Sequence, residues 1–177
     1  HSLACLIGPS EIRIIDTGSL ETITVLPIKR TSEAVFFNDN SKVFLKNEQG
    51  LYILDIPSQT VIKEKPTDSM ELTCFRLSHD SSVLACICGN RVVKLLDAYT
   101  LEEKLTIDCS GAIPKAVFFD PWDETLFIAF HDHSVGRFST ADGTLVSMLD
   151  KKVEGLVDIL FDEGKNIFIT IGKRNLT

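Results

Sequence analysis

A pattern of apolar runs and polar turns occurs four times along the chain. In each copy an apolar run ends, a short polar turn follows, and a second apolar run begins. The copies read AVFFNDNSKVF from Ala34, CFRLSHDSSVL from Cys74, AVFFDPWDETL from Ala116 and DILFDEGKNIF from Asp158. A self-similar unit that recurs at a fixed period indicates a repeat architecture.

The period of this pattern is close to 40 residues. The last apolar residue before the turn advances by 40, 42 and 42 residues, and another large apolar residue follows it seven positions later in every copy. A third column, at the end of a later apolar run, advances by 39, 42 and 42 residues. The three columns are Phe37, Leu77, Phe119 and Phe161; Phe44, Leu84, Leu126 and Phe168; and Asp16, Asp55, Asp97 and Ser139.

Each unit predicts four short strands. The apolar stretches are rich in Val, Ile and Phe and are separated by Asn, Asp, Ser, Gly and Pro, which is typical of strands and tight turns. Runs such as LFIAF from Leu126 are apolar on both strand faces, so we expect sheets that are covered on both sides. Even LEEKL at 101–105, helix-like in isolation, falls at the outer-strand position of the repeat.

The repeat divides the chain into five segments. We expect an incomplete unit of three strands in 1–30, complete units in 31–68, 69–110 and 111–152, and an incomplete unit of two strands in 153–177. SLACLIG near the start matches VLACICG at 83–89, which is the second strand of a unit. The sequence is therefore expected to begin and end in the middle of a unit.

These units resemble the WD-repeat family. The turns FFNDNS, RLSHDS and FFDPWDE are similar to that family's V-x-F-S-P-D-G turn, and LACIC is similar to the strand after it. The third strand, which ends in Trp-Asp in the family, ends here in Ile-Asp, Leu-Asp, Leu-Asp and Phe-Ser. The family's Gly-His pair is absent, and only Asp132 matches its buried hydrogen-bond network.

The resemblance covers essentially the whole chain and implies an all-β fold, a β-propeller of four-stranded antiparallel blades. About four blades' worth of sequence is present, so we expect part of a larger propeller of the seven-bladed type. A closed four-bladed ring is the alternative, and it leaves one strand over. Asp16, Asp55 and Asp97 are expected to accept hydrogen bonds from the backbone of their own turns, a structural role.

Charge and composition limit the kinds of partner and the cellular setting that we expect for this chain. The chain carries 18 basic and 25 acidic residues, a net charge of −7, and its basic residues are scattered pairs such as Lys29/Arg30. This distribution argues against a nucleic-acid or membrane partner. No apolar run approaches the roughly 18 residues of a membrane span. Five cysteines without a disulfide or zinc spacing favour a reducing, cytoplasmic setting.

Two clusters are candidates for chemistry. Strand alternation would place His131 and His133 on one side, a spacing that suits zinc or copper, but no third ligand is apparent and both could instead lie in a turn. Cys86 and Cys88 lie within a core strand, which favours burial over metal or redox chemistry. No nucleophile elbow or glycine-rich phosphate loop is present, so we expect no nucleotide, metal or other cofactor.

The predicted function is a non-enzymatic protein–protein interaction scaffold, a propeller segment of a larger multidomain signalling protein in the cytoplasm. By the resemblance, turns between second and third strands form a binding rim. Trp122, in a different turn, either anchors a partner or covers its own blade. The rival is a propeller enzyme or metal-binding propeller that uses a central channel or a His131/His133 site. The expected rim residues are Lys46, Glu48, Asn90, Arg91, His131, Asp132 and His133.

Overall fold

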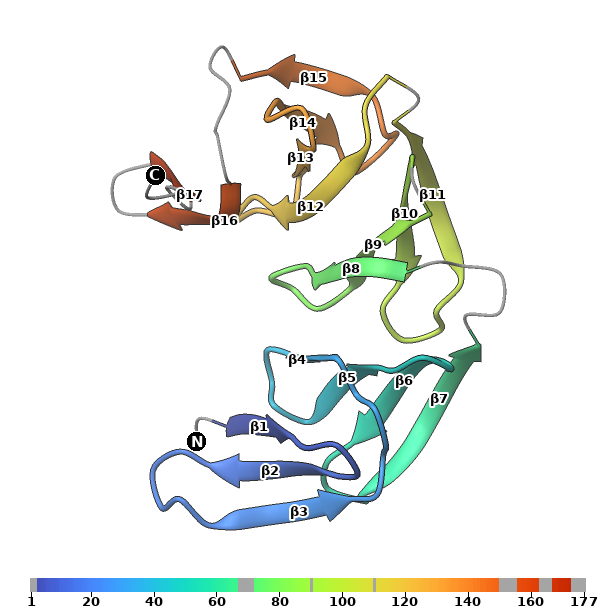
Figure 1. Ribbon diagram of the computed structural model, residues 1–177, viewed down its shortest axis with the longest axis vertical. Coiled ribbons are helices and arrows are strands. Elements are labelled where there is room, and N and C mark those ends of the chain that lie inside the picture. Colours follow the sequence, from blue (N-terminus) through green and yellow to red (C-terminus); the bar gives the residue numbers. More distant parts are fainter. Residues whose placement is uncertain are drawn as a thin grey trace. The chain divides into compact units, whose positions relative to one another are not determined.

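The computed structural model describes residues 3–66, 72–89, 91–109 and 111–149, and the backbone of two further strands at 156–162 and 167–172. The described residues form seventeen β-strands and no helix. All strand pairs are antiparallel, and within each sheet the strands pair in the order in which they follow one another in the sequence (Figure 1). The predicted all-β architecture and the predicted succession of three, four, four, four and two strands are confirmed.

The strands form five sheets. The first contains β1 (Leu3–Ile7), β2 (Ile12–Asp16) and β3 (Thr22–Leu26), and the second contains β4 (Glu33–Phe36), β5 (Lys42–Lys46), β6 (Gly50–Asp55) and β7 (Thr60–Pro66). The third contains β8 (Leu72–Leu77), β9 (Val83–Cys88), β10 (Val92–Asp97) and β11 (Glu103–Asp108). The fourth contains β12 (Pro114–Phe119), β13 (Thr125–Phe130), β14 (Val135–Ser139) and β15 (Leu145–Met148), and the fifth pairs β16 (Leu156–Asp162) with β17 (Ile167–Gly172).

The chain divides into two compact units, His1–Met70 and Glu71–Thr177. In the first unit, apolar side chains of the first and second sheets face one another. Ile12 and Ile14 of β2 pack with Val43 and Leu45 of β5 and with Leu54 of β6, and all five are fully buried. Each such side chain contributes about 1.5–3 kcal/mol when it is buried. The two sheets of this unit are therefore held together by a shared core.

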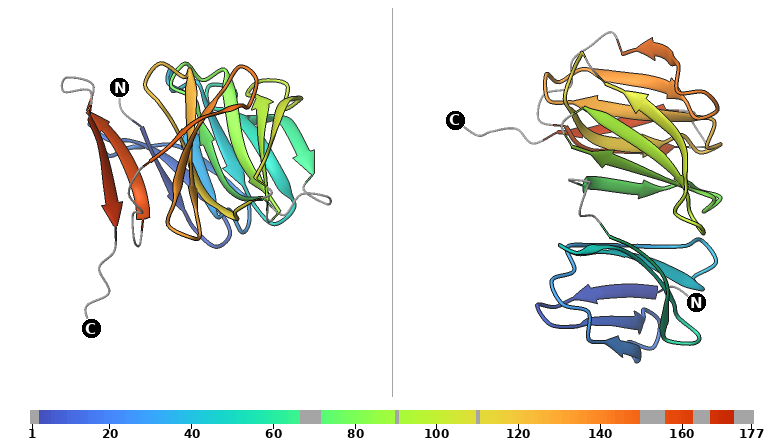
Figure 2. Two further views of the ribbon diagram at one scale, coloured as in Figure 1. Left: turned by 90° about the horizontal axis from the view of Figure 1, so that it is seen from above. Right: turned by 90° about the vertical axis from the view of Figure 1, so that its right-hand side faces the viewer.

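In the second unit, the third and fourth sheets share an extensive apolar core, with β12 beside β8 and β9 (Figure 2). Ile87 and Leu95 of the third sheet contact a cluster that includes Leu126 and Ile128 of the fourth. Every residue of β13 is buried, and its other face, with Phe127 and Ala129, belongs to a separate cluster. Burial on both faces of β13 explains why the run LFIAF from Leu126 is apolar without interruption.

The repeat is visible in the backbone dihedral angles. The turn before the last strand of each of the first four sheets contains one residue with positive φ, and these residues are 39, 42 and 42 positions apart: Leu20, Gln59, Leu101 and Gly143. The turn between the first and second strands has the same feature at Asn40, Ser81 and Asp123. Equivalent turns therefore have equivalent geometry although their sequences differ.

The aspartates at the ends of third strands cap their own turns, as predicted. Oδ1 of Asp16 accepts hydrogen bonds from the backbone N–H groups of Gly18 and Ser19, each at 2.8 Å. In the third sheet, the N–H groups of Tyr99 and Thr100 donate to Asp97 at 3.0 and 2.9 Å. These bonds to the charged carboxylate lower the pKa of Asp97 to about 2.

The alignment of the first complete repeat is wrong by one residue. The structure pairs Phe36 with Val43, whereas Leu77 pairs with Leu84 and Phe119 with Leu126. Phe37 instead occupies the first turn position, because its N–H donates to the carbonyl of Lys42. Two adjacent phenylalanines satisfy the same apolar column, so the sequence alone does not distinguish them. Phe37 and Phe44 are both buried, with ring centroids 5.0 Å apart.

Two other sequence expectations are resolved in the second unit. The LEEKL segment is not helical, and from Glu103 onward it forms the outer strand β11. Cys86 and Cys88 are buried thiols on β9. Burial also raises the pKa of Cys109 to about 11, and the nearby Asp108 carboxylate adds to the effect. Within the described residues, no helix is long and apolar enough to cross a membrane.

Candidate protein-binding site

An open pocket of about 520 Å³ lies in the first unit, between the β3–β4 loop and the β5–β6 turn. The loop supplies one side of the pocket and the turn supplies the other. This volume falls within the range of roughly 300–1,000 Å³ that is typical of ligand sites. The pocket adjoins Glu48, one of the predicted rim residues. Its lining residues are Pro27, Ile28, Lys29, Arg30, Asn47, Glu48, Gln49, Tyr52 and Val61.

The β3–β4 loop is fixed to both sheets of the unit. The N–H of Arg30 donates to the carbonyl of Pro9, in the β1–β2 turn, at 3.4 Å. Nδ2 of Asn47 donates to the carbonyl of Lys29 at the same distance. Arg30 also has a φ of 56°, a left-handed conformation that costs free energy for a residue with a side chain and persists only where its surroundings enforce it. The loop therefore holds Lys29 and Arg30 in a defined position.

The β5–β6 turn is organised by the same asparagine. Oδ1 of Asn47 accepts hydrogen bonds from the N–H groups of Gln49 and Gly50, at 2.8 and 3.1 Å. Gly50 is required here, because a Cβ at this position would lie 2.5 Å from the carbonyl oxygen of Lys65 on β7. The turn therefore presents the side chains of Glu48 and Gln49 from a rigid backbone.

Tyr52 and three apolar side chains complete the pocket. Tyr52 is only 8% exposed, and burial raises the pKa of its hydroxyl, so the group stays protonated at neutral pH. Pro27, Ile28 and Val61 provide apolar surface, and Val61 is 45% exposed. The pocket thus has an apolar part beside a hydrogen-bonding and charged part.

Two cations and one anion line the pocket. Arg30 and Glu48 form an ion pair whose side chains are 73% and 68% exposed, so the pair contributes at most about 1 kcal/mol and can open at low cost. Lys29 is exposed and makes no ion pair within the part of the chain that the structure describes. The three side chains carry a net charge of one positive unit.

The structure places the predicted rim residues in separate turns. Lys46 ends β5 and is half-buried, and its carbonyl accepts the N–H of Ser32 at 2.8 Å. Arg91 is exposed in the turn before β10, and its carbonyl accepts the N–H of Cys109 at 2.8 Å. Asn90 lies outside the described residues. Of the rim residues that the structure describes, only Glu48 lines the pocket.

His131, Asp132 and His133 are exposed in the β13–β14 turn. Of the two alternatives for the histidines, the structure shows the turn and not the strand, because β13 ends at Phe130 and β14 begins at Val135. Asp132 accepts hydrogen bonds from the N–H and the hydroxyl of Ser134, at 3.1 and 2.6 Å, and so stabilises its own turn. The described residues contain no group of three or more His, Cys, Asp or Glu residues that could hold a metal ion.

Trp122 lies in the β12–β13 turn, at the other end of β13 from the histidines. Its side chain is 61% exposed, so most of its surface does not cover the blade-like sheet to which it belongs.

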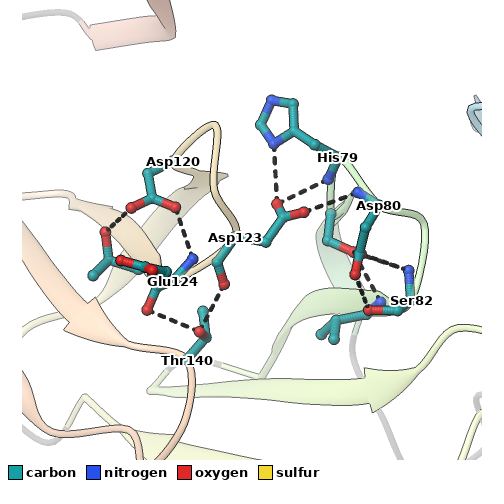
Figure 3. Close-up of polar contacts among 10 residues, drawn as sticks. His79, Asp80, Ser82, Asp120, Asp123, Glu124 and Thr140 are labelled. Atoms are coloured by element: carbon teal, nitrogen blue, oxygen red, sulfur yellow. Dashed lines mark hydrogen bonds and ion pairs between the residues drawn. The ribbon is translucent and has the colours of Figure 1, made fainter. Parts of the chain in front are cut away.

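Sequence reasoning missed a polar connection between the third and fourth sheets, drawn in Figure 3. Asp123, in the β12–β13 turn, accepts hydrogen bonds from the N–H groups of His79 and Asp80 at 2.8 Å each, and its Oδ1 lies 3.0 Å from Nδ1 of His79. We call this contact the Asp123 bridge. Thr140 in turn donates its hydroxyl to the carbonyls of Asp123 and Glu124. The bridge joins equivalent turns of two neighbouring sheets, so its role is structural.

The pocket itself was also missed. In the sequence, Lys29 and Arg30 are one of several basic pairs, and they lie in the connection between one unit and the next, outside the strands that define the repeat. The available signal was the LPIKR segment, where a proline and two cations interrupt the strand pattern. Neither the protein-family models nor the curated proteins include a match for this chain, so a functional proposal depends on the site itself.

Proposed function

We propose that this chain is a segment of a WD-repeat-like β-propeller and acts as a non-enzymatic protein interaction module. In this proposal the sheets are blades of a larger, seven-bladed type of propeller within a cytoplasmic scaffold or signalling protein. The recurring antiparallel sheets and the conserved turn geometry within the chain support the propeller. All five cysteines are thiols, which fits a reducing compartment.

The pocket in the first unit is the observation that carries the interaction function. Its loop and turn are fixed by backbone and Asn47 hydrogen bonds, yet its charged side chains are exposed. A rigid backbone that presents exposed side chains binds a partner at low cost in conformational entropy. The pocket is also lined by residues of the β5–β6 turn, the turn type that the family resemblance assigned to binding.

Charge reversal tests this function. We expect Lys29→Glu to reduce capture of the partner protein from cell extract by at least about tenfold, because a cation that lines the pocket becomes an anion beside Glu48. Capture is measured by quantitative mass spectrometry against the unmodified chain. The matched control is Lys63→Glu, on the exposed strand β7 but outside the pocket.

Both variants should keep the melting temperature of the unmodified chain, since both lysines are exposed. Capture that survives Lys29→Glu, or that falls equally in both variants, would contradict a binding role for the pocket.

A further inference from the structure

We infer that the pocket in the first unit binds a short acidic segment of a partner protein, with one carboxylate side chain next to an aliphatic side chain. This inference rests on the proposed interaction function and specifies the chemistry of its ligand. It follows from the charge, the apolar surface and the hydrogen-bonding groups of the pocket.

The charged side chains that line the pocket favour a ligand with a single negative charge. Lys29 and Arg30 contribute two positive charges and Glu48 one negative charge, so one ligand carboxylate neutralises the three side chains. A phosphate group carries a charge of about −1.5 to −2 near neutral pH and would leave excess negative charge beside Glu48. The pocket therefore fits Asp or Glu better than a phosphorylated residue.

The rest of the chain makes this selection sharper. The chain as a whole has a net charge of −7, which repels an acidic peptide, whereas the side chains of Lys29 and Arg30 attract it at this pocket. Because Lys29 and Arg30 are exposed, added salt screens their attraction for the peptide, with a Debye length of about 10 Å at 0.1 M ionic strength.

The apolar surface selects the neighbouring side chain. Pro27, Ile28 and Val61 line the same pocket as the cations. An aliphatic side chain that covers this surface gains about 25 cal/mol for each Å² of apolar area removed from water. An ordinary acidic tract without an aliphatic residue would leave the surface exposed, so a mixed acidic and apolar segment is the better ligand.

Gln49 supplies the hydrogen bonds that orient a peptide. Its backbone N–H is used by Asn47, but its side-chain amide is exposed and makes no hydrogen bond within the described part of the chain. It can donate to a peptide carbonyl or to the ligand carboxylate. Because Asn47 fixes the backbone on both sides of the pocket, little order has to be gained on binding.

The test is an NMR titration of the full chain with three blocked dipeptides: acetyl-Leu-Glu-amide, acetyl-Leu-Gln-amide and acetyl-Leu-phosphoSer-amide. We expect saturable shifts of the backbone amides of Lys29, Arg30 and Gln49 with the Glu peptide. Binding of the Gln peptide should be about fivefold weaker, the size of effect expected for an exposed charge pair. Lys29→Gln should weaken binding of the Glu peptide to the same extent, whereas Lys63→Gln should leave its binding unchanged.

Equal binding of the Glu and Gln peptides, tighter binding of the phosphoserine peptide, or shifts outside the pocket would overturn the inference. The outcome is distinguishable from failure of the proposed function. If partner capture depends on Lys29 but the dipeptides fail to bind there, the interaction function holds and the ligand chemistry is wrong. If capture does not depend on Lys29, the proposed function fails.

Discussion

A buried polar side chain stabilises or destabilises this protein according to whether it has a hydrogen-bond partner. Thr125 is 7% exposed; its hydroxyl donates to Asp120 at 2.7 Å and accepts from Nε of Arg137 at 3.0 Å. Thr24 on β3 is 4% exposed, but its hydroxyl has no hydrogen-bond partner among the residues that the structure describes. The same residue type therefore stabilises the fold at one position and destabilises it at the other.

Replacing each threonine with valine separates the two cases. We expect Thr24→Val to raise the free energy of unfolding by about 1 kcal/mol, because it removes a buried hydroxyl without a partner and keeps the side-chain shape. Thr125→Val should lower it by about 2 kcal/mol, because Asp120, which is 1% exposed, loses a hydrogen bond.

Urea unfolding of the two variants and the unmodified chain measures both changes. If Thr24→Val proves as destabilising as Thr125→Val, the hydroxyl of Thr24 has a partner and the argument from burial is wrong.

At the scale of the elements, turns do more than terminate strands, because they also join one sheet to the next. The Asp123 bridge attaches the β12–β13 turn to the β8–β9 turn, next to the apolar core that the third and fourth sheets share. Asp123 has a φ of 59° and its side chain is 15% exposed. A carboxylate that is mostly shielded from water and accepts two backbone N–H groups makes stronger bonds than an exposed one.

Asp123→Asn tests the bridge without disturbing the turn, because asparagine tolerates the left-handed conformation. The substitution removes the charge and one acceptor oxygen, and we expect it to cost about 2 kcal/mol. Hydrogen exchange of the His79 and Asp80 amides should accelerate.

Asp142→Asn is the matched control for the bridge. The carboxylate of Asp142 accepts hydrogen bonds from Thr144, within its own turn between β14 and β15. This change should leave exchange at His79 and Asp80 unaltered. Unchanged exchange in Asp123→Asn as well would show that the apolar core alone holds the two turns together.

Periodicity predicts the elements well because every unit buries equivalent positions. The strand order, the buried run in β13 and the turn role of Asp97 could all be predicted from the sequence. The alignment at Phe36 and Phe37 could not, because the two neighbours have the same hydrophobicity and only the hydrogen bond of Phe37 to Lys42 distinguishes them.

The candidate site was harder to predict because it is formed by tertiary contacts. Glu48 was proposed from its turn, but its position beside Arg30 requires two segments 18 residues apart in sequence to meet. The Asp123 bridge joins residues more than 40 positions apart. Repeat patterns describe what units share, whereas both features depend on residues that occur in one unit only.

The whole molecule contains two compact units with different features. The second unit contains the apolar core of the third and fourth sheets and the Asp123 bridge, and the first contains the pocket with its two cationic side chains. The charged side chains that line the pocket sum to one positive charge, whereas the chain as a whole has a net charge of −7. This contrast makes the first unit the part of the chain that we expect to contact a partner.

Photo-crosslinking from the pocket tests that claim most directly. We expect a chain that carries benzoylphenylalanine in place of Gln49 to form a covalent adduct with a partner protein in cell extract, and acetyl-Leu-Glu-amide to reduce its yield. The same group in place of Lys63, outside the pocket, should give no such adduct. No adduct from position 49, or the same adduct from both positions, would contradict a protein-binding role for the pocket.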